Sequence, residues 1–465
     1  MRAILLIDFG STYTKLTAVD LDAPRVLGHS QAFTTASTDI SIGLQNAMAA
    51  LEASCGVLDY QARLACSSAA GGLNMVACGL VPSLTSKAAK LAAFGAGAKV
   101  IKTFAYQLTL GDIDHINQIK PDILLLSGGI DGGNSEVIIH NAGMLKGAKG
   151  DFPIVLAGNR SAQDECADLL KGSGHPVYRA DNVMPAMNQL NIEPVAKVIR
   201  EIFLKRIILA KGLNKATNLV DGILMPTPSA VLDALTLLSK GDKTTKGLGE
   251  ILAVDLGGAT TDVYSIAKGH PTNPTTVVRG LPEPFVKRTV EGDLGMRYNA
   301  LGILEAVGAD TLSEISGLPA EEVAQTVQDY HDNPSVLPDS DKAYAVDKAL
   351  ASSAIAVALA RHAGVLEQVY TPIGPIYQQT GKDLTQVGRL VVTGGALIYS
   401  KRLETIVTEA LRLQEPFALT PKELQISADK NYILSALGLL AGYEPATALH
   451  LLLEFFGREE AYAVV

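Results

Sequence analysis

Short apolar runs alternate along the chain with longer stretches of helical spacing, and many of the apolar runs end in glycine-rich turns. Apolar runs of about four to eight residues between turn residues are typical of buried strands, whereas apolar residues three and four positions apart are typical of amphipathic helices. Residues 123–126 and 154–157 show the strand pattern, and residues 193–208 form the clearest helical stretch. The pattern predicts an α/β protein.

Two segments in opposite halves of the chain share a strand–turn–strand pattern. The first covers residues 3–19 and breaks at 8–12, and the second covers residues 251–266 and breaks at 255–262. Both place Asp, Gly and Thr in the same order at the turn. This weak internal repeat predicts two hairpins in two related lobes.

The tips of both predicted hairpins have a composition that suits phosphate. Glycine lets several backbone N–H groups converge on one anion because no Cβ stands in the way. Hydroxyl and ammonium groups add further donors. The candidate nucleotide-binding residues at these tips are Gly10, Ser11, Thr12, Tyr13, Lys15, Gly257, Gly258, Thr260 and Thr261.

Aspartates adjoin both tips, and a carboxylate repels phosphate unless a cation lies between them. Mg²⁺ keeps most of its water and is held by one or two carboxylates. We therefore expect Asp8 and Asp255 to anchor Mg²⁺ together with ATP or ADP. The candidate catalytic residues are Asp8, Asp255 and Asp262.

A glycine pair follows a third buried strand near the end of the chain, at Thr393-Gly394-Gly395-Ala396. Close approach of the backbone to adenine or ribose would explain Gly394, Gly395 and Ala396, and so would tight packing between a strand and a helix. The sequence has no GxxxxGK[ST] pattern and no GxGxxG that opens a helix, so P-loop and dinucleotide-binding proteins are not supported.

Composition narrows the function further. The chain has 465 residues and a net charge of −9, which disfavours nucleic acid as a partner because phosphate backbones are held mainly by basic surface. Its length predicts two or three domains. The four cysteines form no CxxC pair and are expected to be buried or idle thiols in a reducing cytosol. The apolar runs are too short to span a bilayer, so we expect a soluble cytoplasmic protein.

The order of these motifs resembles that of the actin, Hsp70 and sugar-kinase superfamily. The segments that resemble its two phosphate motifs, its adenosine motif and its two connecting helices are, respectively, 7–15, 255–262, 390–396, 225–231 and 429–438. The resemblance implies a two-lobed, ribonuclease-H-like ATPase fold that binds the nucleotide between the lobes, with an inserted α/β subdomain in the first lobe.

This resemblance also implies the domain boundaries. The first lobe is expected at 1–235 with the inserted subdomain at about 60–215, the second lobe at 245–445, and a C-terminal tail at 446–465. A hydrophilic stretch at 240–247 is the predicted loop before the second lobe.

Five further segments resemble a family of glutamate mutase accessory proteins called MutL or GlmL, which is unrelated to the mismatch-repair protein of that name. The segments are 66–76, 128–134, 156–159, 288–297 and 361–364. The resemblance implies an ATP-dependent reactivating chaperone that releases damaged cobalamin from an adenosylcobalamin-dependent mutase, so that intact coenzyme rebinds. The implied partners are mutase subunits; which mutase, and whether the chain forms a homo-oligomer, stay open.

Two positions depart from the Hsp70-like pattern. Met225 stands where a glutamate helps to orient the attacking water, which leaves that role open to Asp262, Asp131 or Glu291. Ala259 replaces the third glycine of the second phosphate loop. Both departures predict slow ATP hydrolysis, as in a nucleotide-timed switch.

Three other proteins could be built on the same fold: a small-molecule kinase, a filament-forming actin relative, and a hydantoinase- or carboxylase-type ATPase subunit. No sequence motif identifies the general-base aspartate that a kinase needs beside its substrate.

Several residues allow two interpretations. The glycine-rich segment 127–134 suits packing turns or nucleotide contact. Arg288, Asp293 and Arg297 suit either structural ion pairs or a site. His362, at a predicted helix end, is expected to cap carbonyl groups rather than to catalyse.

Overall fold

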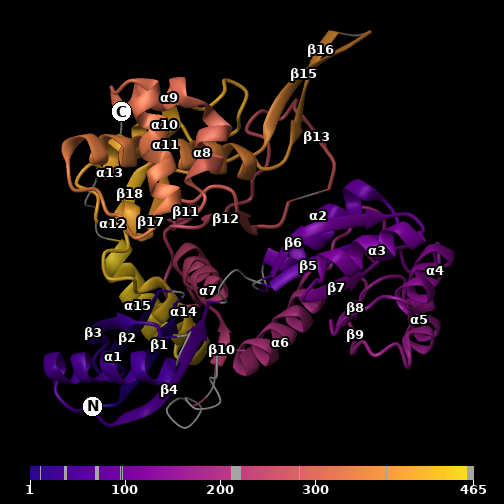
Figure 1. Cartoon of the computed structure of the whole chain (residues 1–465), viewed down its shortest axis with the longest axis horizontal. Helices are drawn as coiled ribbons and strands as arrows, with labels where there is room; N and C mark the ends of the chain where they lie inside the picture. The colour runs from indigo at the N-terminus through magenta and orange to yellow at the C-terminus, as the bar shows by residue number, and fades with distance from the viewer. Residues whose placement is uncertain are drawn as a thin grey trace. The chain divides into compact units, whose positions relative to one another are not determined.

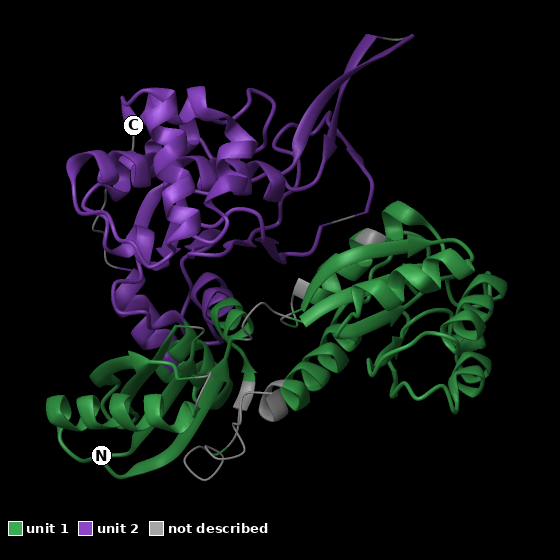
Figure 2. Cartoon of the chain, viewed as in Figure 1, with its two compact units in different colours: residues 1–233, 435–447 green, residues 234–434, 448–465 purple. Residues whose placement is uncertain are grey.

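The structure is a computed structural model that describes all residues except 11, 36–38, 69–72, 95, 97, 211–220, 222, 282, 373 and 458–465. The chain divides into two compact units, Met1–Asp233 with Ser435–Thr447, and Ala234–Leu434 with Ala448–Val465 (Figures 1 and 2). The predicted α/β character is confirmed in both units.

The first unit contains a mixed five-stranded sheet in the order β10-β4-β1-β2-β3. Its strands are β1 (Ala3–Phe9), β2 (Tyr13–Asp20), β3 (Arg25–Phe33), β4 (Tyr60–Ser67) and β10 (Ile223–Pro226). Neighbours β1, β2 and β3 are antiparallel, whereas β4 is parallel to both β1 and β10. Every residue of β1 is buried, and helix α1 (Ile40–Cys55) packs on β2 and β3.

The second unit contains a sheet with the same plan, in the order β14-β12-β11-β17-β18. Its strands are β11 (Ile251–Leu256), β12 (Thr261–Ile266), β14 (Val286–Glu291), β17 (Arg389–Thr393) and β18 (Gln425–Ala428). Neighbours β14, β12 and β11 are antiparallel, and β17 is parallel to both β11 and β18. Both predicted hairpins are therefore confirmed, and the internal repeat reflects two sheets of equal strand order and direction.

A second sheet in the first unit is entirely parallel, in the order β6-β5-β7-β8-β9. Its strands are β5 (Leu73–Gly79), β6 (Ala98–Ala105), β7 (Ile123–Leu126), β8 (Ile154–Leu156) and β9 (Val177–Arg179). The accompanying helices are α2 (Pro82–Phe94), α3 (Leu110–Ile119), α4 (Glu136–Leu145), α5 (Gln163–Leu170) and α6 (Glu193–Ala210). The helix predicted at 193–208 is thus confirmed as α6.

Alternation along these strands separates two hydrophobic cores. Met75 and Ala77 of β5 face a core with α2 and α6, whereas Val76 and Cys78 face a core with α3, α4 and α5. Successive side chains of a strand point to opposite faces, so helices cover both faces of this sheet, as parallel sheets require.

The second unit adds a helical layer and a ribbon to its sheet. The helices are α8 (Ala300–Val307), α9 (Ala309–Ser316), α10 (Ala320–Asp332), α11 (Asp341–His362), α12 (Gly395–Ile398) and α13 (Leu403–Arg412). The ribbon consists of β13 (Val277–Arg279), β15 (Val365–Thr371) and β16 (Gly374–Thr380) in the order β13-β16-β15. In Figure 1 the β15–β16 hairpin extends away from the helices of its own unit.

Helix α11 is the longest apolar helix among the described residues. An 18-residue window of this 22-residue helix has a mean hydropathy of 1.4, enough in length and composition to cross a membrane, although no uninterrupted apolar run in the sequence indicated this. However, 61% of that window is buried inside the protein, and α11 contacts α8, α9, α10 and α13. This burial is that of a core helix.

Three helices lie where the chain passes between the units. Helix α7 (Thr227–Lys240) contains the boundary after Asp233, α14 (Leu434–Tyr443) begins at another boundary, and α15 (Pro445–Phe456) contains a third. The predicted extents of the lobes and of the 446–465 tail stay a prediction.

Gly438 of α14 packs directly on α7. A Cβ at Gly438 would lie 1.8 Å from the carbonyl oxygen of Ala230 and 2.4 Å from its carbon. Since these are backbone atoms, only helix displacement could relieve the clash.

We expect Gly438→Ala to lower the free energy of unfolding by about 2–4 kcal/mol, because overpacking forces the two helices apart. Gly442→Ala is the matched control in the same helix, where a Cβ meets nothing within 4 Å; it should be neutral or raise stability by up to ~1 kcal/mol. Urea denaturation of both variants measures the difference, and equal effects would contradict the packing argument.

Candidate functional site

Asp8 lies at the end of β1 and is 4% exposed. Its carboxylate accepts hydrogen bonds from the hydroxyl of Thr227 at 2.6 Å and from that of Ser435 at 2.9 Å. Thr227 is the first residue of α7, and Ser435 lies in the first turn of α14. A helix N-terminus stabilises negative charge, so both connecting helices support this carboxylate. The sequence indicated the two helices as motifs but not these two hydroxyl groups.

Lys15 lies opposite Asp8 in the β1–β2 register, and Cys66 lies opposite Asp8 on β4. Residues paired across neighbouring strands share one face of the sheet. The face therefore presents an ammonium group beside the aspartate at the hairpin end. Burial, with Asp8 nearby, raises the pKa of the Cys66 thiol well above its usual value, so this cysteine is the buried thiol that the sequence predicted.

Glycine is required at the first hairpin tip. The N–H of Gly10 donates to the carbonyl oxygens of Asp8 and Tyr13, both at 3.0 Å, and a Cβ on Gly10 would lie 2.4 Å from the Tyr13 oxygen. Tyr13 stacks on Phe33 with ring centroids 4.6 Å apart, whereas Thr12 is exposed. Ser11 lies outside the described residues.

The second hairpin carries Asp255 at the end of β11, half-buried and opposite both Asp262 on β12 and Thr393 on β17. Asp255 thus has the place in its sheet that Asp8 has in the first. The residue across the hairpin differs, because Lys15 lies opposite Asp8 whereas Asp262 lies opposite Asp255.

The second phosphate loop, residues 257–260, is held in place because the carbonyl oxygens of residues 257–259 accept hydrogen bonds from segment 296–299. The Gly257 oxygen accepts from the Met296 N–H at 3.1 Å, the Gly258 oxygen from the N–H groups of Arg297 and Tyr298 at 2.9 Å, and the Ala259 oxygen from the Asn299 amide at 2.6 Å. In a trans peptide the C=O and the following N–H point in opposite directions. The N–H groups of residues 258–260 are therefore directed away from segment 296–299, as an anion site requires.

Two further residues brace this loop. A Cβ on Gly295 would lie 2.4 Å from the Ala259 carbonyl carbon, so glycine is needed there for close approach. The buried hydroxyl of Thr261 donates to the Leu294 oxygen at 2.6 Å. Segment 288–297, which resembled an accessory-protein motif, thus includes the support of the phosphate loop, while direct contact between Thr261 and a nucleotide stays a prediction.

Asp262 is engaged in a buried ion pair. Its Oδ1 accepts from Arg288 Nε at 2.8 Å and from Nη2 at 2.5 Å, and the two side chains are 12% and 7% exposed. The guanidinium lies over the ring of Tyr264, with its carbon 5.7 Å from the centroid. Any role of Asp262 in orienting water therefore requires it to share its carboxylate with Arg288.

Arg297 and Asp293, whose roles the sequence also left undecided, form ion pairs as well. Arg297 makes a two-pronged pair with Asp347, with both N–O distances 3.0 Å, and its guanidinium carbon lies 4.2 Å from the Tyr330 ring centroid. Asp293 accepts from Arg361 at 2.8 Å. Of the two interpretations, these contacts favour the structural one.

The two glycines of the adenosine motif fit different explanations: one serves strand packing, and the other leaves room for close approach of a nucleotide. Gly394 has φ +94°, and a Cβ there would lie 2.3 Å from the Leu256 oxygen, so this glycine serves tight packing against β11. A Cβ on Gly395 would meet only Tyr432 and Tyr399, at 3.6 and 4.0 Å. These two tyrosines, whose ring centroids lie 6.4 Å apart, are not among the candidate residues that the sequence indicated, although Tyr432 belongs to the second connecting-helix segment.

A cavity of about 630 Å³ lies among α12, α13, β18 and the end of α15. Lys401, Arg402, Lys430, Asp429 and Phe456 are among its lining residues, and Gly394, Gly395 and Ala396 are not. Its volume suits a ligand, but it does not coincide with the predicted nucleotide residues.

The glycine-rich segment 127–134 is held in place by hydrogen bonds to residues that follow the next two strands. The buried Asn159 amide accepts from the Gly132 N–H at 3.1 Å and donates to the Gly133 oxygen at 3.0 Å. Asp131 accepts from the Asn182 amide at 2.8 Å and the Arg160 N–H at 3.0 Å. These contacts support the packing interpretation for the segment.

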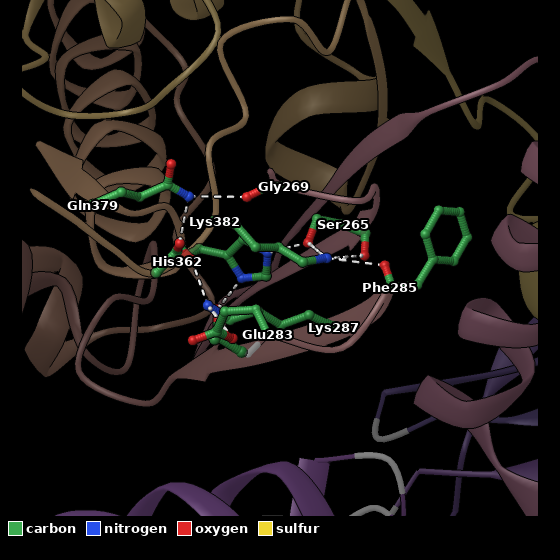
Figure 3. Close-up of polar contacts among 10 residues, drawn as sticks. Ser265, Gly269, Glu283, Phe285, Lys287, His362, Gln379 and Lys382 are labelled. Atoms are coloured by element: carbon green, nitrogen blue, oxygen red, sulfur yellow. Dashed lines mark hydrogen bonds and ion pairs between the residues drawn. The ribbon is translucent and has the colours of Figure 1, made fainter. Parts of the chain in front are cut away.

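His362 belongs to a buried polar cluster in the second unit (Figure 3). Its ring nitrogens bond to the hydroxyls of Thr289 and Ser265, each at 2.8 Å, so the ring does not cap carbonyl groups as the sequence suggested. Lys287 takes that role instead and donates to the His362 carbonyl oxygen at 2.6 Å. Burial, with Lys287 and Lys382 nearby, holds the pKa of His362 well below its usual value.

Lys382 is the fully buried cation of this cluster, with its ammonium 2.9 Å from the Phe285 oxygen and 3.2 Å from the Ser265 hydroxyl. Burial and the charge of Lys287 lower the pKa of Lys382 from 10.5 to about 7. Gln379, at the base of the ribbon, donates to the oxygens of Gly269 and Gly381 at 2.9 Å. The cluster thus fixes the ribbon to the sheet.

Two sheets of one plan, each with an aspartate and a glycine turn at the end of its central hairpin, define an α/β protein of the two-lobed actin, Hsp70 and sugar-kinase fold. The model of the MutL protein family matches residues 4–456. Protein MutL of Clostridium tetanomorphum is 44% identical over 458 residues, which cover 98% of this chain and 99% of that protein. The chain belongs to the MutL family.

Solved structures resemble the chain over most of its length at low identity. Component A of the (R)-2-hydroxyglutaryl-CoA dehydratase of Acidaminococcus fermentans is 12% identical, with a TM-score of 0.33, and 96% of this chain and 99% of that chain are covered. Xylulose kinase of Lactobacillus acidophilus is also 12% identical, with a TM-score of 0.35 and coverage of 100% and 93%.

We expect Asp262→Asn to lower the free energy of unfolding by about 3–5 kcal/mol, because the Arg288 charge would remain buried without its partner. The double variant Asp262→Leu/Arg288→Met should cost less than the sum of the single changes. Arg412→Met, which removes two ion pairs of an exposed arginine, with Glu409 and Glu314, is the control and should cost at most about 1 kcal/mol. Additive losses in urea denaturation would contradict a coupled pair.

The depressed pKa of Lys382 predicts a pH-dependent stability. Between about pH 7 and 10.5 the unfolded chain binds a proton at Lys382 that the folded chain has released. The free energy of unfolding therefore rises with pH across this window, by at most about 1.4 kcal/mol per pH unit, and levels off below pH 7, where Lys382 is protonated in both states. Lys382→Met should remove this slope, and the exposed control Lys422→Met should keep it. If the free energies of unfolding of the wild type and of Lys382→Met differ by the same amount at every pH, the lowered pKa of Lys382 is refuted.

Proposed function

We propose that this chain is an ATP-dependent activator that reactivates an adenosylcobalamin-dependent mutase, glutamate mutase or a related aminomutase, in the cytoplasm. It acts as a chaperone that lets damaged cobalamin leave and intact coenzyme rebind. Membership of the MutL family supports an accessory role toward a partner enzyme. The observation that carries the ATP-dependent part is the pair of equivalent aspartate-bearing hairpins in two equivalent sheets.

Each hairpin supplies different groups to ATP or ADP. The first offers the Lys15 ammonium and a tight turn at Gly10. The second offers the N–H groups of residues 258–260, whose carbonyls are already used by the neighbouring segment. We propose that one nucleotide contacts both hairpins, so that its γ-phosphate stabilises the closed arrangement and hydrolysis releases it.

Asp8 and Asp255 fit a hydrated Mg²⁺. The described residues contain no group of three or more His, Cys, Asp or Glu able to hold a metal, but Mg²⁺ bound with nucleotide needs only one or two carboxylates. A carboxylate has about four acceptor sites, so Asp8 can keep its bonds to Thr227 and Ser435 while accepting from metal-bound water. The ion would neutralise phosphate charge.

The side chains support slow hydrolysis. Met225 occupies β10, where no carboxylate replaces the usual glutamate. The three candidates for orienting water are all engaged: Asp262 with Arg288, Asp131 with Asn182, and Glu291 with Arg361 at 2.8 Å. In-line phosphoryl transfer then depends on positioning alone, which suits a timed switch.

The test is restoration of an inactivated mutase. Glutamate mutase inactivated with hydroxocobalamin should regain activity when this protein, ATP, Mg²⁺ and fresh coenzyme are added. Asp8→Ala and Asp255→Ala should each lower Mg²⁺-dependent ATP affinity at least about tenfold in calorimetry and abolish recovery, because removing either carboxylate leaves the metal without an anchor.

Asp310→Ala, at an exposed aspartate of α9, is the matched control and should behave as wild type. ATP binding that needs no Mg²⁺ and survives both aspartate changes would overturn the proposed site. Recovery without nucleotide would overturn the ATP-dependent mechanism.

A further inference from the structure

Three neighbouring parallel strands of the second unit end at one edge of their sheet. Asp255 lies at the end of β11 opposite Thr393 of β17, and Asp429 directly follows β18, the strand beyond β17. The Asp429 N–H donates to the Val392 oxygen at 2.9 Å. Since neighbouring strands lie about 4.8 Å apart, Asp255 and the segment after β18 are separated by about 10 Å along this edge.

Two tyrosines accompany these strand ends. Tyr399 follows α12, which begins at Gly395, and Tyr432 lies three residues after Asp429. A Cβ on Gly395 would lie 3.6 Å from the Tyr432 hydroxyl oxygen and 4.0 Å from the Tyr399 ring. Gly395 is exposed, and so is Tyr399, with 67% of its surface accessible. The two rings therefore flank an accessible glycine with room for a group above it.

The backbone of Tyr432 is held in an unfavourable conformation. Its φ is +51°, in the left-handed region that a large side chain rarely adopts. The Asp429 carboxylate accepts from the N–H groups of Ile433 at 2.8 Å and Leu434 at 3.3 Å, and the Asp429 carbonyl oxygen accepts from the Tyr432 N–H at 3.1 Å. Strained backbone that its surroundings hold in place clusters at ligand sites. The turn thus keeps the Tyr432 ring beside Gly395 in spite of the strain.

Tyr432 also lies within electrostatic reach of the second hairpin. Its pKa is raised above the usual value, first by burial and then by the neighbouring acidic groups of Tyr399, Asp255 and Asp429. In a nucleoside triphosphate the ribose and the α-phosphate separate the base from the β- and γ-phosphates. A nucleotide whose phosphates lie at Asp255 can therefore extend along the strand ends and place its base at the two rings.

We propose that Tyr399 and Tyr432 bind the base of ATP, which lies over Gly395 in stacking contact with their rings. The inference rests on the proposed function and names the residues that hold the base. Aromatic side chains stack on a base through its π-face, without hydrogen bonds to its edge. Core packing would account for the half-buried Tyr432, but it accounts neither for the exposed ring of Tyr399 nor for the exposed glycine between the two.

The test compares Mg²⁺·ATP with Mg²⁺·tripolyphosphate, which has the phosphates but no base, in calorimetry on the full chain. Tyr399→Ala should weaken ATP binding roughly tenfold through loss of stacking and leave tripolyphosphate binding unchanged. Tyr399→Phe keeps the ring and should bind both ligands as wild type does. Tyr370→Ala, at a tyrosine of β15 that is 79% exposed, is the matched control and should also match wild type.

Two further variants probe the same space from other positions. Tyr432→Asn removes the second ring and introduces a residue that adopts the left-handed conformation more readily. Gly395→Ala adds a Cβ that meets no listed protein atom closer than 3.6 Å but projects into the space of the base. Both should keep the free energy of unfolding near that of wild type, lower ATP affinity, and leave tripolyphosphate affinity unchanged.

The failure of this inference differs from the failure of the proposed function. Wild-type ATP affinity in both Tyr399→Ala and Tyr432→Asn, equal loss of the two ligands in these variants, or a wild-type chain that binds tripolyphosphate as tightly as ATP would overturn the base-binding role and leave the hairpins in place. Asp255→Ala, by contrast, should weaken both ligands. A wild-type chain that binds neither would overturn the proposed function itself.

Discussion

The hydrogen bonds to the buried carboxylate of Asp8 are the interactions on which the first half of the molecule depends. A carboxylate with 4% exposure needs hydrogen-bond donors to compensate for lost water. The donors come from Thr227 and Ser435, which are more than 200 residues apart in sequence and begin two different helices. The same two helices touch backbone to backbone at Gly438 and Ala230. One side chain thus joins the hairpin to two of the three helices at which the chain passes between its units.

The second half applies the same plan with different chemistry. Asp255 occupies the position of Asp8, but the residue across the hairpin is an aspartate paired with Arg288 instead of a lysine. Positive character at the second hairpin therefore comes from the backbone N–H groups of residues 258–260. Their orientation is fixed by segment 296–299, which binds the opposite side of the same peptides. The duplicated fold places two unlike candidate anion-binding elements at equivalent positions of their sheets.

The parallel sheet of the first unit has a different role in this arrangement. A small cavity lined mainly by apolar residues lies at its carboxyl edge, whereas its glycine-rich segment 127–134 is occupied by its own contacts through Asn159 and Asp131. The proposed nucleotide-binding hairpins therefore belong to other sheets than this one.

The sequence alone determined the two hairpins, the α/β character and the family resemblance, because Asp-Gly-Thr turns between apolar runs are local patterns that the backbone obeys locally. It also indicated α6 and the buried thiols of Cys66, Cys78 and Cys166, whereas Cys55 is only half-buried. Only the tertiary structure decided what each polar side chain bonds to. Thr227 and Ser435 meet Asp8 through packing of distant segments, Asp262 is taken by Arg288 on the neighbouring strand, and His362 bonds to Thr289 and Ser265 and leaves the carbonyl to Lys287. Burial of α11 was likewise decided by its neighbours, since its composition alone allows a membrane helix. Pairings between distant residues leave no periodic trace along a single chain, and that is why the sequence could name the candidates but not their partners.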